Sequence, residues 1–161
     1  MRVGVLTISD RVSLGEMEDR GGAAVIAGLR DAIDVIEIVA ETLPDDGERI
    51  IRRLGIWADE DQLDAIITTG GTGLGPRDVT PEATLEAIDK RVPGIEEALR
   101  AAGLAKLPMA MLSRGVAGVR GQTLIVNLPG SPTGAAEGTA ILAQVLPHAI
   151  DLLHGRTRHG G

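Results

Sequence analysis

Cysteine is absent from the 161-residue sequence, which excludes a disulfide framework, a thiolate metal site and a cysteine nucleophile. Phenylalanine and tyrosine are also absent, and Trp57 is the only aromatic residue. Without aromatic side chains, the chain cannot build the stacking platforms on which single-stranded nucleic acids are usually held. We interpret Trp57 itself, which lies in an amphipathic segment, as a packing residue.

Positive charge and long apolar runs are scarce as well. Lys and Arg number 16 against 23 Asp and Glu, a formal net charge of -7, so the overall field does not favour a polyanion. No apolar run approaches the roughly 18 residues of a membrane span, and the first residues, MRVGVLTISD, lack the pattern of a signal peptide. We therefore predict a cytoplasmic protein with no nucleic-acid or membrane partner. A small anion would have to be bound by a local arrangement of donors, because the overall charge does not attract it.

Several catalytic motifs are missing too. His148, His154 and His159 show no H-x-x-x-H spacing, so a zinc site is not favoured, and no G-x-S-x-G nucleophile elbow occurs. A P-loop would need a Gly-Lys pair, which is absent. The dinucleotide pattern G-x-G-x-x-G, started at Gly71, would need glycine where Pro76 stands.

Short β-branched runs alternate with segments of helical period, which predicts an α/β fold with three layers and a mostly parallel central sheet. Strands are expected at 3–8, 35–40, 64–69, 116–120 and 122–127. Helices are expected at 22–33, around 50–54, at 81–90, at 95–102 and from 131 onward, with Pro147 breaking or kinking the last run. We expect one domain over residues 1–155 and a frayed polar tail over 156–161.

A glycine-rich loop follows the third expected strand, in the stretch TTGGTGLGPRDVTPEAT. Bare backbone N–H groups there can approach an anion closely, and hydroxyls can assist them. The alternative is a sharp turn that only needs positive φ. The candidate anion-binding residues are Thr69, Gly70, Gly71, Thr72, Gly73 and Gly75.

An Arg-Asp pair comes directly after this loop. Arg77 suits a phosphate, whereas Asp78 would repel one unless a cation lay between them, so the pair suggests a metal-bound phosphate. The plainer alternative is that Asp78 caps the following helix and Arg77 is solvated. We also expect Thr80, before Pro81, to cap that helix.

Other strand ends carry polar residues that can reach the same edge of a parallel sheet. Ser9 and Asp10 follow the first strand, and Asp45 and Asp46 of LPDD follow the second. For Asp46 the alternative role is a helix cap. After a late strand, VNLPGSP supplies Asn127, Gly130 and Ser131.

Taken together, ISDR, LPDD, TTGGTG, RDVTPEAT, LSR and NLPGSP, in this order, resemble the molybdopterin-binding family of molybdenum cofactor biosynthesis. The pattern is similar to the MogA/MoaB-type adenylyltransferases and to the N-terminal domain of gephyrin. It covers roughly residues 2–155. The joined TTGGTG and RDVTPEAT are its most specific part.

The resemblance implies transfer of AMP from Mg-ATP to the terminal phosphate of molybdopterin, with release of pyrophosphate. It implies a homotrimer, with a hexamer as the alternative, and a metal-inserting protein of the same pathway as a further partner. The acidic pair that is expected to act in catalysis and to hold magnesium falls on Asp45, with Asp46 left open, and on Asp78. Binding of nucleotide or pterin phosphate falls on Ser9, Asp10, Arg77, the glycine loop, Ser113, Asn127, Pro129, Gly130, Ser131 and Pro132.

No general base is required for this transfer, because the attacking phosphate is already ionised at neutral pH. Two other functions remain open: a non-catalytic pterin-binding or scaffolding protein of the same fold, and a generic nucleotide-binding regulator. The presence of both carboxylates favours the enzyme. The sequence leaves open whether molybdenum or tungsten is the metal inserted later.

Overall fold

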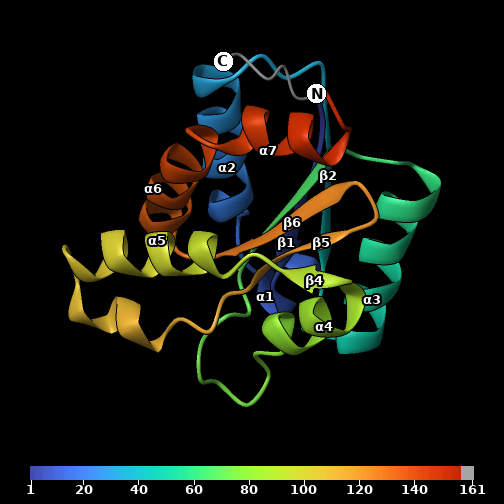
Figure 1. Ribbon diagram of the computed structural model, residues 1–161. Helices are drawn as coiled ribbons and strands as arrows, with labels where there is room; N and C mark the ends of the chain where they lie inside the picture. The colour runs from blue at the N-terminus through green and yellow to red at the C-terminus, as the bar shows by residue number, and fades with distance from the viewer. Residues whose placement is uncertain (157–161) are drawn as a thin grey trace.

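A six-stranded sheet runs through the centre of the protein, as the computed structural model shows for residues 1–156 (Figure 1). The strand order is β2-β1-β3-β6-β5-β4. The first four strands in this order are parallel, whereas β5 and β4 are antiparallel to their neighbours. The strands are β1 (Arg2–Ile8), β2 (Glu37–Leu43), β3 (Ala65–Thr69), β4 (Lys90–Arg91), β5 (Ala117–Arg120) and β6 (Thr123–Leu128).

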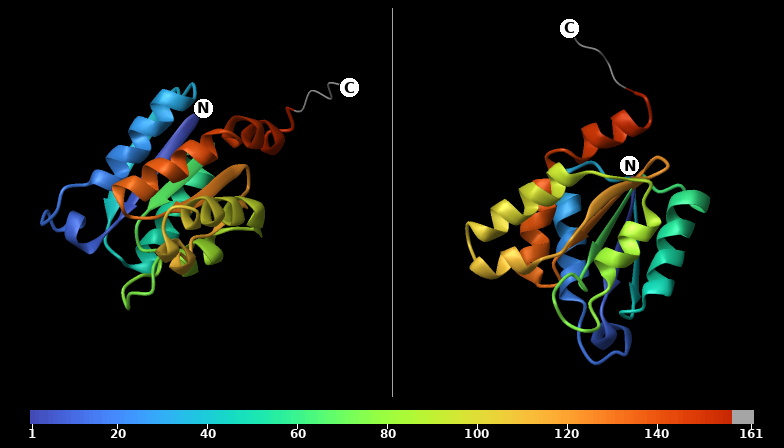
Figure 2. Two further views of the ribbon diagram at one scale, coloured as in Figure 1. Left: turned by 90° about the vertical axis from the view of Figure 1, so that its left-hand side faces the viewer. Right: turned by 60° about the horizontal axis from the view of Figure 1, so that its bottom comes forward.

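Helices cover both faces of this sheet (Figure 2). In the right-hand view, α3 and α4 lie on one side of the sheet and α2, α5 and α6 on the other. The helices are α1 (Asp10–Ser13), α2 (Arg20–Ala32), α3 (Gly47–Gly55), α4 (Thr80–Ala87), α5 (Pro93–Leu104), α6 (Pro132–Ala143) and α7 (Leu146–Leu153), with a π-helical turn η1 (Ile56–Glu60) and a 3-10 helix η2 (Pro108–Leu112). The predicted three-layer α/β fold with a mostly parallel sheet is confirmed.

The sheet separates two hydrophobic cores, and this explains why its central strands are apolar on both faces. Along β3, Ile67 joins the core beneath α2 and α6, whereas Ile66 joins the core beneath α3 and α4. Trp57 is 2% exposed and belongs to the second core, which confirms its packing role. A Cβ at Gly4 of β1 would overlap the indole ring, so glycine makes room for it there.

Most predicted elements agree with the structure to within a few residues, with two clear differences. The second strand spans Glu37–Leu43 rather than 35–40, because it pairs with β1 along its full length, from Arg2 opposite Glu37 to Ile8 opposite Leu43. The helix predicted to reach Lys90 ends at Ala87.

Beyond that end, the chain turns onto the sheet. The N–H groups of Asp89 and Val92 donate to carbonyls of β5, and this pairing draws residues 90–91 into strand β4. The break expected at Pro147 is confirmed, since α6 ends at Ala143 and Pro147 stands in the first turn of α7. The frayed tail predicted for 156–161 lies, except for Arg156, outside the described residues. No helix within residues 1–156 is both long enough and apolar enough to cross a membrane.

Candidate functional site

A cavity of about 580 Å³ opens where the parallel strands end. We name it the strand-end cavity. Strands β1, β2, β3 and β6 all point their carboxyl ends toward this edge, which is where open α/β sheets bind ligands. Of the predicted site residues, it brings together Ser9, Asp45, Thr69, Gly70, Gly71, Asp78, Gly130 and Pro132.

Asp45 is fixed by a reciprocal pair of hydrogen bonds with Asp10. The Asp10 N–H donates to Asp45 Oδ2 at 3.0 Å, and the Asp45 N–H donates to Asp10 Oδ1 at 3.0 Å. The other carboxylate oxygen, Asp45 Oδ1, is buried without a hydrogen-bond partner among the described residues. Burial raises the pKa of the Asp45 carboxyl, and the nearby charges of Asp10 and Asp78 also raise it, although the Asp10 N–H opposes the shift. An unpartnered buried carboxylate oxygen calls for a proton or a cation.

Asp45 and Asp46 occupy different places in the structure. Asp46 is the N-cap of α3, where its Oδ1 accepts from the Arg49 N–H at 3.2 Å. Asp45, and not Asp46, lines the cavity. The capping alternative therefore holds for the second aspartate of LPDD.

The glycine loop uses part of its backbone inside the protein. The Gly70 N–H donates to the Leu128 carbonyl, and the Gly75 N–H donates to Asp78 Oδ2 at 3.0 Å. Within residues 1–156, the N–H groups of Gly71, Thr72, Gly73 and Leu74 have no acceptor. These four donors are what remains of the loop for an anion, so the anion site stays a prediction that involves fewer N–H groups than the whole loop offers.

Positive φ accounts for only two of the four glycines in this loop. Gly70 has φ of +100° and Gly71 has φ of +66°, values that favour glycine. Thr80 does not cap α4 as expected. Its buried hydroxyl instead donates to the Gly70 carbonyl at 3.0 Å, because the loop folds back over the start of the helix.

Arg77 does not line the strand-end cavity. Its guanidinium forms a two-pronged ion pair with Asp10, at 2.9 and 3.0 Å. This pairing raises the pKa of Arg77 and lowers the pKa of Asp10. The side chain of Arg77 is 65% exposed, so this ion pair lies at the surface. Asp78 does not cap α4 either, because its carboxylate faces the glycine loop.

A second cavity, of about 590 Å³, lies between α5, η2 and α6. We name it the helix-side cavity. Its lining is largely apolar and includes Leu99, Leu107 and Ile141. The predicted site residues on its wall are Gly73, Ser113, Asn127, Pro129 and Ser131.

The NLPGSP loop separates the two cavities. Pro129 and Ser131 face the helix-side cavity, whereas Gly130 and Pro132 face the strand-end cavity. Thr69 ties this loop to the end of β3, because its hydroxyl donates to the Pro129 carbonyl at 2.7 Å. The two cavities are therefore neighbours across four residues of chain.

Two of the predicted pterin-side residues, Asn127 and Ser131, form hydrogen bonds within the protein. Asn127 is 3% exposed; its amide donates to the hydroxyls of Thr68 and Thr84, and its Oδ1 accepts from the Val116 N–H. Its role is thus to join β6 to its neighbours. Ser131 is the N-cap of α6, where its Oγ accepts from the Gly134 N–H at 3.1 Å. Thr72 and Gly75 line neither cavity.

The residues at the start of α2 also line the strand-end cavity, and we did not expect them there. Asp19 caps α2 through the Gly22 N–H and accepts from the Thr7 hydroxyl, and Arg20 beside it brings a positive charge to the cavity wall. A Cβ at Gly21 would lie 2.9 Å from the Gly130 carbonyl oxygen, so this helix start fits closely against the NLPGSP loop. The pattern of an aspartate cap followed by paired glycines, EDRGG, was the available signal.

Comparison with known proteins shows the family of the chain. Residues 4–148 match the family described as "Probable molybdopterin binding domain". The molybdopterin adenylyltransferase of Helicobacter pylori is 39% identical over 156 residues, covering 96% of this chain and 89% of that protein. Gephyrin of Dictyostelium discoideum is 40% identical over 166 residues, which cover 97% of this chain and 23% of gephyrin.

Among solved structures, the molybdopterin biosynthesis enzyme MoaB of Thermus thermophilus superimposes with a TM-score of 0.86 at 51% identity, covering 96% of each chain. The family match extends over most of the 161 residues, and the solved structure has the same fold. The chain therefore belongs to the molybdopterin-binding domain family of molybdenum cofactor biosynthesis.

Proposed function

We propose that the protein is a molybdopterin adenylyltransferase, which transfers AMP from ATP to the terminal phosphate of molybdopterin and releases pyrophosphate. The observation that carries this proposal is the pair of cavities of similar size on either side of residues 129–132, because a transfer between two substrates needs two adjoining sites. Relatives named molybdopterin adenylyltransferase, at 38–39% identity over nearly the whole chain, support it.

The two cavities differ in chemistry, and this suggests which substrate each one takes. The strand-end cavity is lined by the carboxylates of Glu18, Asp19, Asp45 and Asp78 and by one guanidinium, that of Arg20, which pairs with Glu18 at 3.7 Å. This acidic lining suits the triphosphate of ATP only with a cation between them. The helix-side cavity has an apolar wall with Ser113 and Ser131 at its edge, which suits a pterin ring with polar substituents. The phosphates of both substrates would then meet at the NLPGSP loop.

Magnesium fits the residues of the strand-end cavity. Asp45 Oδ1 is buried and lacks a partner among the described residues, and Asp78 lines the same cavity. No group of three or more metal-ligating side chains occurs within residues 1–156, so the substrate oxygens and water would supply the remaining ligands, as is usual for Mg²⁺. When bound, Mg²⁺ would neutralise charge between the phosphate oxygens.

The chain itself contributes positioning and backbone hydrogen-bond donors. The attacking phosphate needs no general base, so the absence of a histidine from the cavity lining is consistent with this chemistry. The unpaired N–H groups of Gly71, on the strand-end cavity, and of Gly73, on the helix-side cavity, are donors for phosphate oxygens.

We also propose a homotrimer. Large apolar side chains are exposed over the end of α5 and along η2: Leu104, Leu107, Met109, Met111 and Leu112. Such a group of exposed apolar side chains on one segment is typical of a protein–protein interface. Light scattering at micromolar concentration should give three times the monomer mass of 16.7 kDa, and a monomer would contradict the proposal.

The decisive experiment for the function is an assay of the purified protein with ATP, Mg²⁺ and molybdopterin. We expect pyrophosphate and adenylylated molybdopterin in equal amounts. Tight pterin binding without pyrophosphate would instead indicate a non-catalytic member of the family. Pyrophosphate release that does not depend on molybdopterin would indicate a different acceptor.

A further inference from the structure

Arg114 connects the wall of the helix-side cavity to the glycine loop, part of which lines the strand-end cavity. It lies between Ser113 and Gly115, which line the helix-side cavity, but its own side chain reaches away from them to the glycine loop. Its Nε donates to the Gly73 carbonyl at 2.8 Å, and its Nη2 donates to the Asp78 carbonyl at 2.9 Å. The third nitrogen, Nη1, pairs with Glu82 on α4.

These contacts hold the glycine loop at both ends. The Arg114 main chain adds another bond, because its N–H donates to the Thr72 carbonyl at 2.9 Å. Residues 72, 73 and 78 are thus all tied to one arginine, and the loop between them closes on the Asp78 carboxylate through the Gly75 N–H. Three acceptors around a planar fork require a guanidinium, because a lysine ammonium cannot reach them together.

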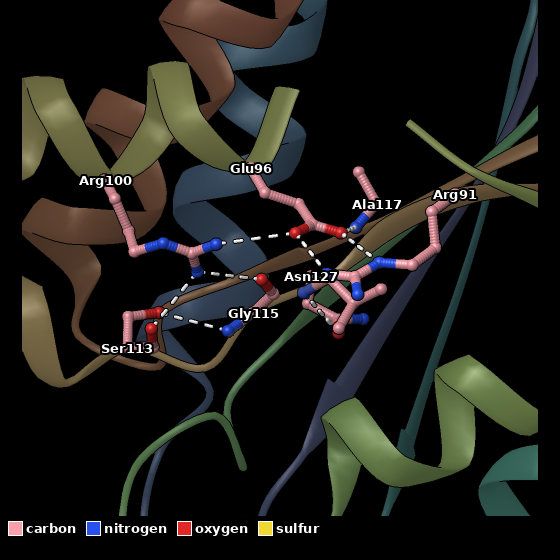
Figure 3. Close-up of polar contacts among 8 residues, drawn as sticks. Arg91, Glu96, Arg100, Ser113, Gly115, Ala117 and Asn127 are labelled. Atoms are coloured by element: carbon pink, nitrogen blue, oxygen red, sulfur yellow. Dashed lines mark hydrogen bonds and ion pairs between the residues drawn. The ribbon is translucent and has the colours of Figure 1, made fainter. Parts of the chain in front are cut away.

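The backbone of Arg114 is itself held from behind (Figure 3). Arg100 Nη1 donates to the carbonyls of Ser113, at 3.1 Å, and Gly115, at 3.0 Å, one on each side of Arg114. Arg100 is in turn paired with Glu96, whose side chain is 3% exposed. Figure 3 shows Glu96 between Arg91 and Arg100, where it also accepts from the Ala117 N–H. A buried, fully bonded carboxylate gives this chain of contacts a rigid anchor.

We propose that Arg114 is a positioning residue: it fixes the glycine loop and the backbone of Asp78 in the geometry that the strand-end cavity needs, and it does so from a position between two residues that line the helix-side cavity. Arg114 lines neither cavity, so it acts through the loop and not by touching a substrate. This inference rests on the proposed function only for its effect on turnover.

Arg120 offers a matched control, because it makes the same kinds of bond at a place remote from both cavities. Its guanidinium forms a two-pronged pair with Asp59 and donates to the Ala87 carbonyl at 2.7 Å. The two side chains are also similarly exposed, 34% for Arg114 and 30% for Arg120. Arg114→Lys and Arg120→Lys therefore lose comparable structural bonds while both keep their positive charge.

The test compares these two variants in three measurements. Thermal unfolding should show losses of similar size. Amide hydrogen exchange at Gly75 and Asp78, whose N–H groups are hydrogen-bonded within the loop, should become at least about tenfold faster in Arg114→Lys and stay unchanged in Arg120→Lys, because only the first releases the loop. The kcat for pyrophosphate release should fall about 100-fold in Arg114→Lys alone, a size typical of small displacements at a reacting centre.

Two results would overturn the proposal. One is equal loop exchange in both variants, which would reduce Arg114 to a structural role. The other is a large loss of turnover in Arg114→Lys with unchanged loop exchange, which would make it a direct substrate contact. If the wild-type protein releases no pyrophosphate, the proposed function fails, while the exchange comparison still decides the role of Arg114.

Discussion

Gly71 lies against Asp45, so closely that a Cβ built on the glycine would come within 3.0 Å of Asp45 Oδ1. The same Cβ would overlap the hydroxyl of Thr80. The only carboxylate oxygen of Asp45 left for a ligand thus faces bare backbone, and the space between them exists because position 71 has no side chain.

Gly71→Ala should therefore abolish nucleotide binding and lower stability. Gly121→Ala is its control: Gly121 has φ of +56°, close to the +66° of Gly71, but its Cβ would meet nothing within 4 Å. Both substitutions should cost about 1–2 kcal/mol for the left-handed backbone. Only Gly71→Ala should lower the free energy of unfolding by more than this and also weaken ATP binding. Urea unfolding will measure the first effect and calorimetric titration the second. Equal behaviour of the two variants would mean that the loop moves aside.

Asp45→Asn and Asp78→Asn should each lower the rate of pyrophosphate release by orders of magnitude while pterin affinity survives. Electrostatic stabilisation of transferring charge is worth several kcal/mol, and each 1.36 kcal/mol changes the rate about tenfold. If both carboxylates hold one cation, the loss of rate in the double variant should be far smaller than the sum of the two single losses, expressed as activation free energies.

Asp46→Asn is the control for these two variants, since asparagine caps a helix as well as aspartate does. It should keep full turnover and nearly full stability, because Asp46 caps α3. Full turnover in Asp45→Asn and Asp78→Asn would disprove the metal assignment. Loss of pterin binding in either variant would make that carboxylate a pterin contact.

Thr80→Val should destabilise the protein by about 1–3 kcal/mol, because the Gly70 carbonyl loses a buried hydrogen bond. Thr123→Val removes a comparable buried bond, from Thr123 Oγ1 to the Leu63 carbonyl, at the opposite end of the sheet. We expect similar denaturation midpoints for the two variants, but weaker ATP binding only for Thr80→Val. If Thr123→Val weakened ATP binding equally, the effect would be one of general stability.

The stability of the protein should depend on Asp59 at acid pH. The hydrogen bond from Arg120 lowers the pKa of Asp59 below its ordinary value of 3.8. A lowered folded-state pKa contributes stability that is fully present above pH 3.8 and is lost as the pH falls through the folded value. Since Asp59 is 52% exposed, the contribution is at most about 1 kcal/mol.

Chemical denaturation between pH 2.5 and 6 can test this dependence. The stability difference between wild type and Asp59→Asn should be constant above pH 4 and shrink below it. Salt should reduce the difference, because an exposed pair is screened. A difference that grows on acidification would contradict the assignment.

The sequence predicted the strands well and the side-chain pairings poorly, for a physical reason. Hydrophobic runs and turn residues are local, so the strand ends at Ser9, Asp45 and Thr69 could be placed at one edge before the structure was known. Hydrogen-bond partners are not local: the pairing of Arg77 with Asp10 joins residues 67 positions apart and depends on strand order. From the sequence alone, the guanidinium of Arg77 beside the glycines could equally have faced a phosphate or a carboxylate.

Asn127 and Arg114 illustrate the same limit from two sides. Asn127, one residue before the end of β6, lies on the wall of the helix-side cavity as expected of a pterin-side residue, but the sequence did not show that its amide also bonds to Thr68 and Thr84. Arg114 follows Ser113 in the LSR motif, yet only the folded chain shows that its side chain reaches Gly73, 41 residues away. The roles of the cavity residues toward substrates, and the cytoplasmic location, stay predictions.

The two-residue strand β4 has a consequence for how copies of the protein can associate. It closes one edge of the sheet with Lys90 and Arg91, both exposed. The charge of Arg91 is paired with Glu96, but an edge only two residues long offers few free backbone groups to a second copy, and very short edge strands are one way in which natural sheets avoid edge-to-edge aggregation. Assembly by strand addition is therefore disfavoured at this edge, and subunits that associate on this side of the molecule would use helical surfaces instead.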